Sequence, residues 1–256
     1  MLLCMLPAAS RTQTKLKSPP AIPFSVGETL VYDGKLSKII SGISIAELKF
    51  TLDRASDGTD YTVVTEARNK GTLLKLFRFS FLQRYETTID GGERFRAIRT
   101  KKHDVQKERI RDSEALFNYD EKRVTFIETD PKEPMRPPRK IASEIDTGAQ
   151  DLISGIYLLR TLPLAVGKTF EMTVSDSGLV YQIPVKVTGR ELQKTVVGRV
   201  WCFRVEPDVF GPGRIIEKEG SMVIWITDTP RRLPVRSLIN TSIGKIEIKL
   251  KSATKQ

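Results

Sequence analysis

Hydrophobic and polar residues alternate along most of the chain, in short stretches that turn residues separate. Residues 29–32, 43–52 and 61–67 alternate in this way, with turns expected at Asp33-Gly34 and Asp57-Gly58. A period of two places successive side chains on opposite faces of a strand. Further strands are predicted at 77–81, 95–101, 107–112, 116–119, 124–128, 170–174, 180–187, 199–205, 222–227, 233–240 and 245–250. Turns recur every ~8–12 residues, which is typical of an all-β sandwich or barrel, so we predict a mainly β fold.

One stretch has helical spacing instead. Leu152, Ile156 and Leu159 recur at that spacing, and Pro163 ends the pattern. Thr147 and Gln150 are spaced as in a capping box, in which side chains at the first turn satisfy free backbone amides. We predict one central helix over about 147–161. The expected architecture is a curved antiparallel sheet or incomplete β-barrel that this helix plugs or covers.

A short internal repeat bears on the domain organisation. Residues 163–170 match residues 23–30, with Pro, Val, Gly and Thr at the same positions. We predict a single β-rich domain over 23–250, with two related halves at 23–140 and 163–250 that the helix joins. Shared turn chemistry or chance is the alternative, since Pro and Gly produce similar turns in unrelated places.

The first residues differ in composition from the rest. Residues 1–10 are apolar and then small, and Ala8-Ala9-Ser10 resembles a signal-peptide cleavage site. A basic leader is lacking and the apolar part is short, so the segment is read either as a truncated signal peptide or as a disordered terminus. Residues 11–22 are rich in Lys, Ser, Thr and Pro and are expected to form a tether. The signal-peptide interpretation predicts an exported protein.

Composition narrows the chemistry. The chain has one His and two Cys among its 256 residues, too few for a usual zinc site, and a His-based triad would depend on His103 alone. Asp146 and Asp151 flank the predicted helix start, where capping explains them without catalysis. No run of about 20 apolar residues is present to span a membrane. We therefore expect no metal, no cofactor and no enzymatic activity.

Two sets of side chains are candidates for ligand binding. The apolar set lies at alternate positions of predicted strands and consists of Phe77, Phe79, Phe81, Trp201, Phe203 and Trp225. The basic set lies in two adjacent segments and consists of Arg94, Arg96, Arg99, Lys107, Arg109 and Arg111. The first would line an apolar concavity, or else form plain core. The second would form a positive sheet face for an anionic group, or else a solvated outer face.

Three stretches resemble a known family. The first comprises 23–32 and 39–50, the second 151–161 with Pro163-Leu164 and Gly167, and the third 200–207, Gly220, 223–225, Asp228, 231–235 and Gly244. Together they are similar to the bacterial family called domain of unknown function 3108, exported cell-envelope proteins. This resemblance implies export, a curved antiparallel sheet and no established chemistry. Residues 225–235 are also similar, more weakly, to a hairpin of LolA-like lipoprotein carriers, half-barrels that hold acyl chains, although those carriers begin with a helix.

From these observations we expect a non-enzymatic, exported cell-envelope protein that binds an amphiphilic or lipid-like ligand in a half-barrel. Its apolar tail would lie inside and an anionic head near the Arg and Lys strands. The net charge of +11 is compatible with an anionic envelope polymer as partner. Nucleic acid is not expected, because no binding module or aromatic-interleaved basic motif is present. The alternatives are a structural or protein-interaction module of the envelope, and a protein that binds or processes acidic glycan.

Overall fold

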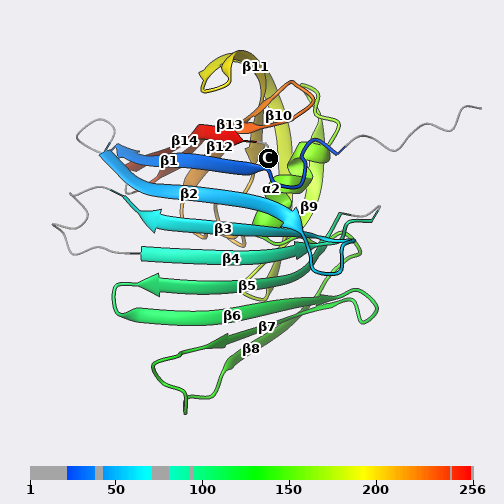
Figure 1. Ribbon diagram of the computed structural model, residues 1–256, viewed down its shortest axis with the longest axis vertical. Coiled ribbons are helices and arrows are strands. Elements are labelled where there is room, and N and C mark those ends of the chain that lie inside the picture. The colour runs from blue at the N-terminus through cyan, green and yellow to red at the C-terminus, as the bar shows by residue number, and fades with distance from the viewer. Residues whose placement is uncertain (1–21, 38–42, 71–80, 93–94, 243, 255–256) are drawn as a thin grey trace, which may run out of the picture.

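The computed structural model describes residues 22–37, 43–70, 81–92, 95–242 and 244–254, which form a curved sheet around one helix, α2 (Leu152–Thr161) (Figure 1). The first eight strands are β1 (Thr29–Ser37), β2 (Ile43–Arg54), β3 (Tyr61–Asn69), β4 (Phe81–Ile89), β5 (Ala97–Gln106), β6 (Arg109–Asn118), β7 (Arg123–Thr129) and β8 (Arg139–Glu144). The other six are β9 (Thr169–Asp176), β10 (Leu179–Thr195), β11 (Gly198–Pro207), β12 (Gly220–Thr227), β13 (Pro234–Thr241) and β14 (Gly244–Thr254). The predicted mainly β class is confirmed.

All fourteen strands belong to one antiparallel sheet, in the order β8-β7-β6-β5-β4-β3-β2-β1-β14-β13-β12-β11-β10-β9. Consecutive strands are neighbours except for β8 and β9, and the first strand pairs with the last, with Thr29 opposite Thr254. The sheet curves without closing into a barrel, because β8 and β9 are its two edges. The predicted curved antiparallel sheet is therefore confirmed.

The helix and its flanking segments lie between the two sheet edges. The Gln150 amide donates to the Thr173 carbonyl in β9 (2.9 Å), and the Ser175 amide donates back to Gln150 (2.7 Å). At the turn between β9 and β10, the carbonyl of Gly178 accepts a hydrogen bond from the Ser143 hydroxyl of β8 (2.7 Å). The first pair of contacts holds the connecting segment to β9, and the Ser143–Gly178 bond joins β8 directly to the β9–β10 turn.

Helix α2 begins five residues later than predicted. Asp151 is its N-cap: the carboxylate accepts from the Ser154 amide (2.6 Å), and the Ser154 hydroxyl accepts from the Asp151 amide (2.9 Å). The predicted capping box of Thr147 and Gln150 is wrong, because Gln150 bonds to β9 as part of the sheet. The helix ends at Thr161, before Pro163, as the sequence predicts.

Strands β1, β6 and β8 differ from the sequence prediction. Asp33-Gly34 is not a turn, because β1 continues through it to Ser37. Gly34 sits at a bulge where an added Cβ would lie 3.2 Å from the Ala46 Cβ, so the glycine allows close strand packing. Segments 107–112 and 116–119 form the single strand β6, and β8 had not been predicted at all.

The hydrophobic core lies on the concave side of the sheet, against α2. Leu52, Val63 and Ile89 of β2, β3 and β4 are completely buried, and Tyr157 of the helix is 1% exposed. A second cluster packs the C-terminal half of α2, through Leu159, onto the strands from β9 to β12. The helix therefore belongs to the core and separates two parts of the concave surface.

The two copies of the repeated sequence have the same local structure. Gly27 and Gly167 both have positive φ (83° and 88°), and each begins the turn that leads into a strand, β1 or β9. Each glycine amide donates to a neighbouring strand, Gly27 to the Leu52 carbonyl (2.9 Å) and Gly167 to the Val187 carbonyl (2.8 Å). Shared turn chemistry accounts for this agreement, and a relationship between the complete halves stays a prediction.

Candidate functional site

An apolar cavity of about 110 Å³ lies beside α2 on the concave side of the sheet. Its walls come from the helix and from β1, β2, β12, β13 and β14, and include Leu30, Phe50, Ile156, Ile224 and Ile248. A dry engineered cavity of roughly 150 Å³ is large enough for benzene. The space beside α2 therefore suits a small ring or a few methylene groups.

Three residues of this wall carry polar atoms without a partner. The Tyr157 hydroxyl, the Arg160 Nε and the Ser237 hydroxyl are buried and make no hydrogen bond among the residues that the structure covers. Each such atom costs about 1–3 kcal/mol relative to a satisfied one. Burial raises the pKa of Tyr157 well above the usual phenol range, so its hydroxyl stays neutral and able to donate. A ligand with a polar atom would find unused partners here.

A polar pocket of about 50 Å³ lies near the first turn of the helix. It is built from side chains of β5 and β6 that face the concave side, together with the helix cap and the end of β9. Its charged residues are Lys102, Asp104, Arg111, Glu128, Asp151 and Asp176. Acidic side chains outnumber basic ones in this lining, so the pocket favours cationic groups and hydrogen-bond donors.

Asp151 and Asp176 have different roles in the polar pocket. Besides capping α2, Asp151 accepts hydrogen bonds from the hydroxyls of Thr87 (2.6 Å) and Thr100, so its oxygens are engaged in holding the helix to β4 and β5. Burial raises the pKa of Asp176, while the charge of Lys102 opposes that shift. Because burial disfavours the ionised form of Asp176, a positive charge on a ligand beside it would stabilise that ionised form.

The helix provides a surface from one pocket to the other. Leu152 lines the polar pocket and Ile156 lines the apolar cavity. Residues four apart share one face of a helix and are separated by about 6 Å along its axis. Both side chains are partly exposed, whereas Ile153 and Tyr157 beside them are buried. The concave side thus offers a polar end and an apolar end to one short amphiphile.

The aromatic residues proposed from the sequence do not form this cavity. Phe77 and Phe79 lie outside the described residues, and Phe81 begins β4. Phe203 pairs with Ile226 and is buried among β9 to β12, whereas Trp225 occupies the adjacent register position and faces the other side of the sheet. Trp201 is 47% exposed on the β10–β11 hairpin. Phe203 and Trp225 are therefore buried in the core, as in the alternative interpretation, because the strands bury side chains on both of their faces. Ligand binding by this apolar set stays a prediction.

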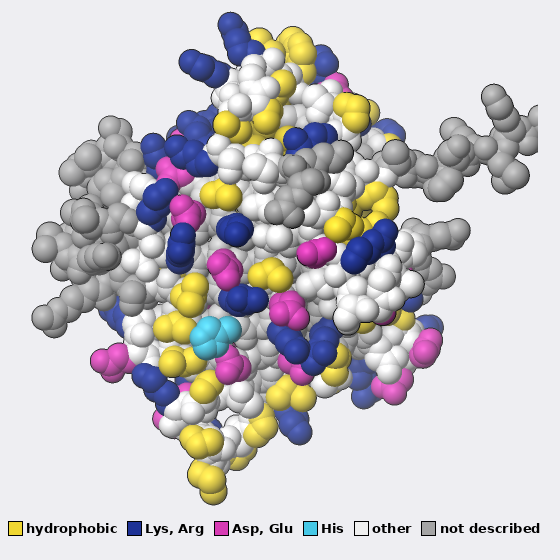
Figure 2. All heavy atoms as spheres, viewed as in Figure 1, with side chains coloured by type: hydrophobic (Ala, Val, Ile, Leu, Met, Phe, Trp, Pro, Cys, Tyr) yellow, Lys and Arg dark blue, Asp and Glu magenta, His cyan; other side chains and the backbone are white. Residues whose placement is uncertain are grey.

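The basic residues are likewise divided between two faces. Arg99 pairs with Glu114 on the outer face, while Arg111 pairs with Asp130 and lines the concave polar pocket. Lys107 lies in the β5–β6 turn, Arg109 is exposed at the start of β6, and Arg94 lies outside the described residues. Figure 2 shows Lys and Arg side chains interspersed with Asp and Glu over the face it presents. Arg99 and Arg111 therefore do not share one face, and binding of an anionic group by the basic set stays a prediction.

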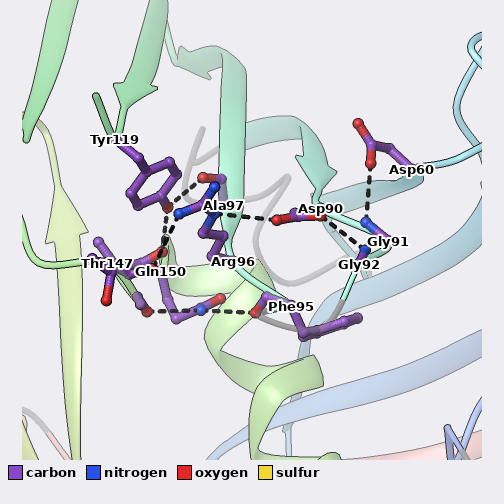
Figure 3. A network of polar contacts seen from close by, with 12 residues as sticks. Asp60, Asp90, Gly91, Gly92, Phe95, Arg96, Ala97, Tyr119, Thr147 and Gln150 are labelled. Atoms are coloured by element: carbon purple, nitrogen blue, oxygen red, sulfur yellow. Dashed lines mark hydrogen bonds and ion pairs between the residues drawn. The ribbon is translucent and has the colours of Figure 1, made fainter. Parts of the chain in front are cut away.

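Arg96 has a structural role (Figure 3). Its guanidinium donates to Asp90 (3.1 Å) and stacks on the Tyr119 ring at 3.8 Å from the ring centre. The Tyr119 hydroxyl in turn donates to the carbonyls of Ala97 (2.6 Å) and Ala149 (2.9 Å). This network holds the segment before α2 against the start of β5.

Two classes of site find no support in the described part of the chain. Among the residues that the structure describes, no helix, α2 included, is long and apolar enough to cross a membrane. No group of three or more His, Cys, Asp or Glu side chains in the same residues is placed to hold a metal ion.

Solved structures and one family profile match this chain. A beta-barrel-like protein of domain of unknown function DUF1849 from Brucella abortus superimposes with a TM-score of 0.60 at 13% identity, over 90% of this chain and 98% of that one. A candidate exported protein with a YmcC-like fold from Bacteroides fragilis covers 91% and 98% of the two chains, with a TM-score of 0.35 at 12% identity. No curated protein matches in sequence. The profile of the family described as "Protein of unknown function (DUF3108)" matches residues 31–251, and this chain belongs to that family.

Proposed function

We propose that this protein binds a small amphiphilic molecule on the concave side of its sheet and does so without catalysing a reaction. The observation that carries the proposal is the apolar cavity beside α2, whose wall includes the unpaired polar atoms of Tyr157, Arg160 and Ser237. Close-packed proteins leave few such spaces, and buried polar atoms normally have partners. An apolar ligand group with one polar atom would fill the space and satisfy at least one of those atoms.

The polar pocket suggests the chemistry at the other end of the ligand. Its lining holds more acidic than basic groups, and its Arg111 is already paired with Asp130. We therefore propose an uncharged or cationic head group, in place of the anionic head expected from the sequence. The distance along the helix from Leu152 to Ile156 limits the ligand to a short amphiphile, or to one part of a longer one.

Export to the cell envelope is part of the proposal. Its support is the apolar start of the chain followed by Ala8-Ala9-Ser10, which resembles a signal-peptide cleavage site. Mass determination of the mature protein from its native host would test this part, since cleavage after this segment is the expected result. An intact amino terminus on protein found inside the cell would contradict it.

The binding test uses the purified full chain and the uncharged fluorescent probe N-phenyl-1-naphthylamine, displaced by octylamine or octanoic acid. We expect saturable binding and stronger displacement by the amine. Ile156→Phe and Ser237→Val each add carbon atoms at the cavity wall and should weaken binding about tenfold. Leu116→Phe, on the outer face of β6 where Leu116 is 46% exposed, is the matched control.

The outcomes separate the parts of the proposal. Ser237→Val removes an unpaired hydroxyl, so the variant should remain folded and keep its stability in urea. Binding that is unchanged in both cavity variants, or equally reduced in Leu116→Phe, would contradict the cavity as the binding site. Stronger displacement by octanoic acid would contradict the proposed head group alone.

A further inference from the structure

The β10–β11 hairpin projects beyond the rest of the sheet (Figure 1). Several of its apolar side chains are exposed to solvent. Leu192 and Trp201 lie opposite each other in its ladder, 44% and 47% exposed. Val196 and Val197 form the tip, 54% and 40% exposed. Four exposed apolar residues are thus gathered at one end of a hairpin. Soluble proteins usually cover or avoid such exposed apolar clusters.

The composition of the tip is unusual for a hairpin turn. Two-residue turns favour Asn, Asp and Gly, because these residues adopt the required backbone angles. Here the turn is held by Thr195, whose hydroxyl accepts from the Val197 amide (3.1 Å) and donates to the Gly198 carbonyl (2.9 Å). The hydrogen bonds of the turn therefore do not depend on the two valine side chains. Their apolar character needs another explanation.

Positive charge lies beside these apolar residues. Lys194 is directly opposite Arg199, and both share a face with Leu192 and Trp201 because they are two positions along each strand. Neither makes an ion pair with any acidic residue that the structure covers. Like charges directly opposite each other destabilise a strand pair. An external anion would relieve that repulsion.

The opposite face of the hairpin is fixed to the sheet. The Glu191 carboxylate accepts from the indole of Trp225 in β12 (2.8 Å), and the Gln193 side chain accepts from Arg236 in β13 (3.5 Å). These contacts orient the hairpin, so the face with Leu192, Trp201 and Arg199 is turned away from the sheet. Lys194 and Val196 are exposed at its margin, where they also line a pocket with β1, β13 and β14. Figure 2 shows hydrophobic and basic side chains close together at the same end of the molecule.

We propose that this face of the β10–β11 hairpin docks on an anionic lipid membrane. Val196, Val197 and Trp201 would enter the interfacial region while Lys194 and Arg199 bind lipid phosphates. Tryptophan concentrates at membrane interfaces, and aliphatic residues next to Lys and Arg are typical of surfaces that lie in them. The core of a protein interface is instead depleted of charge, which makes a membrane the better occupant. The inference is independent of the proposed ligand site.

The chain contains two tryptophans, so fluorescence can report on the hairpin. In a Trp225→Phe variant, Trp201 is the only tryptophan that remains. This variant loses the hydrogen bond to Glu191, so its co-sedimentation with vesicles is compared first with that of the unaltered chain, which it should equal. The full chain is mixed with phosphatidylcholine vesicles or with mixed phosphatidylcholine–phosphatidylglycerol vesicles, with and without brominated lipid. We expect co-sedimentation with the mixed vesicles, a blue shift of Trp201 emission and quenching by the brominated lipid. Added salt should weaken binding, because the attraction of exposed charges is screened.

Two variants and a control complete the test. Val196→Asp with Val197→Asp, and Lys194→Glu with Arg199→Glu, should each weaken vesicle binding by about tenfold or more. Met135→Asp, at a residue that is 94% exposed in the β7–β8 loop, should bind as the unaltered protein does. Absence of binding to the mixed vesicles, or binding without quenching of Trp201, would overturn the proposal. Equal loss of binding in Met135→Asp would also overturn it, and capture of a protein by the hairpin without vesicle binding would assign the surface to a protein partner.

Discussion

Arg160, in the last turn of α2, donates to both carboxylate oxygens of Glu28, just before β1, over 2.6 and 3.0 Å. Both side chains are essentially buried, with 0% and 1% of their surface exposed. The guanidinium also lies over the rings of Phe24 and Tyr157, at 5.0 and 5.1 Å from the ring centres. This pair ties the end of the helix to the first strand, at the wall of the apolar cavity.

The first prediction concerns this pair. Glu28→Gln leaves a buried guanidinium without its counter-charge, so we expect the free energy of unfolding to fall by about 3–5 kcal/mol. Glu66→Gln, which breaks the exposed Arg84 pair (3.2 Å), is the control and should change it by about 0.5 kcal/mol or less. Urea unfolding followed by circular dichroism measures both. Similar effects in the two variants would contradict a structural role for the buried pair.

Asp151 is the second test, because one carboxylate caps α2 and accepts from two strands. Asp151→Ala should lower the free energy of unfolding by about 2 kcal/mol or more, since it removes the cap and leaves the buried Thr87 hydroxyl without its acceptor. Asp151→Asn keeps an acceptor oxygen and should cost less. Thermal and urea unfolding of the three proteins give the comparison. Equal losses in both variants would show that hydrogen bonding is not the reason.

The third prediction is a pH dependence. Burial raises the pKa of Asp176, so the folded chain holds this proton more tightly than the unfolded chain does. As the pH rises from below the ordinary carboxyl range through the raised pKa, the unfolded state ionises first and stability is lost. Asp176→Asn mimics the protonated form, so its stability relative to the unaltered protein should increase over that window. If the difference in stability between Asp176→Asn and the unaltered protein does not change with pH, Asp176 is not the cause of the pH-dependent loss of stability.

The fourth prediction concerns Cys202, whose side chain is completely buried. Burial raises the pKa of its thiol to about 11, with a smaller contribution from the negative charges of Asp228 and Glu191. In a Cys4→Ser variant, labelling by a thiol reagent near neutral pH should therefore be slow until denaturant unfolds the chain. Rapid labelling of the native variant would contradict the burial.

The sequence predicts the class of fold because alternation and turn residues are local signals. The helix is also found, since its apolar spacing and Pro163 are local too. Its start is placed too early because Gln150, which looks like a capping residue, is needed by β9. Competition between local capping and a long-range pairing is not visible in the sequence near Gln150.

Sequence alternation does not place the candidate residues for a different reason. A β-bulge reverses which face the following side chains occupy. Bulges add one residue to β10, at Thr188, and one to β13, at Val235, so alternation cannot be extended across either. The faces of β11 and β12 are also both covered, the outer one by the β10–β11 hairpin, so burial does not identify the concave side. Tyr157 and Ser237 were missed because an unpaired polar atom has no signature in sequence.

The segment from β8 to β9 also couples the two edges of the sheet mechanically. All the remaining connections join strands that are adjacent in the sheet. Residues 145–168, which contain α2, instead cross from one edge of the sheet to the other. This segment thus links the two edge strands, and its helix α2 lies between the polar pocket and the apolar cavity. Spreading the sheet would pull on Asp151 at one end of α2 and on Arg160 at the other. The separation of the edge strands β8 and β9 and the shape of both cavities are therefore coupled through one short helix.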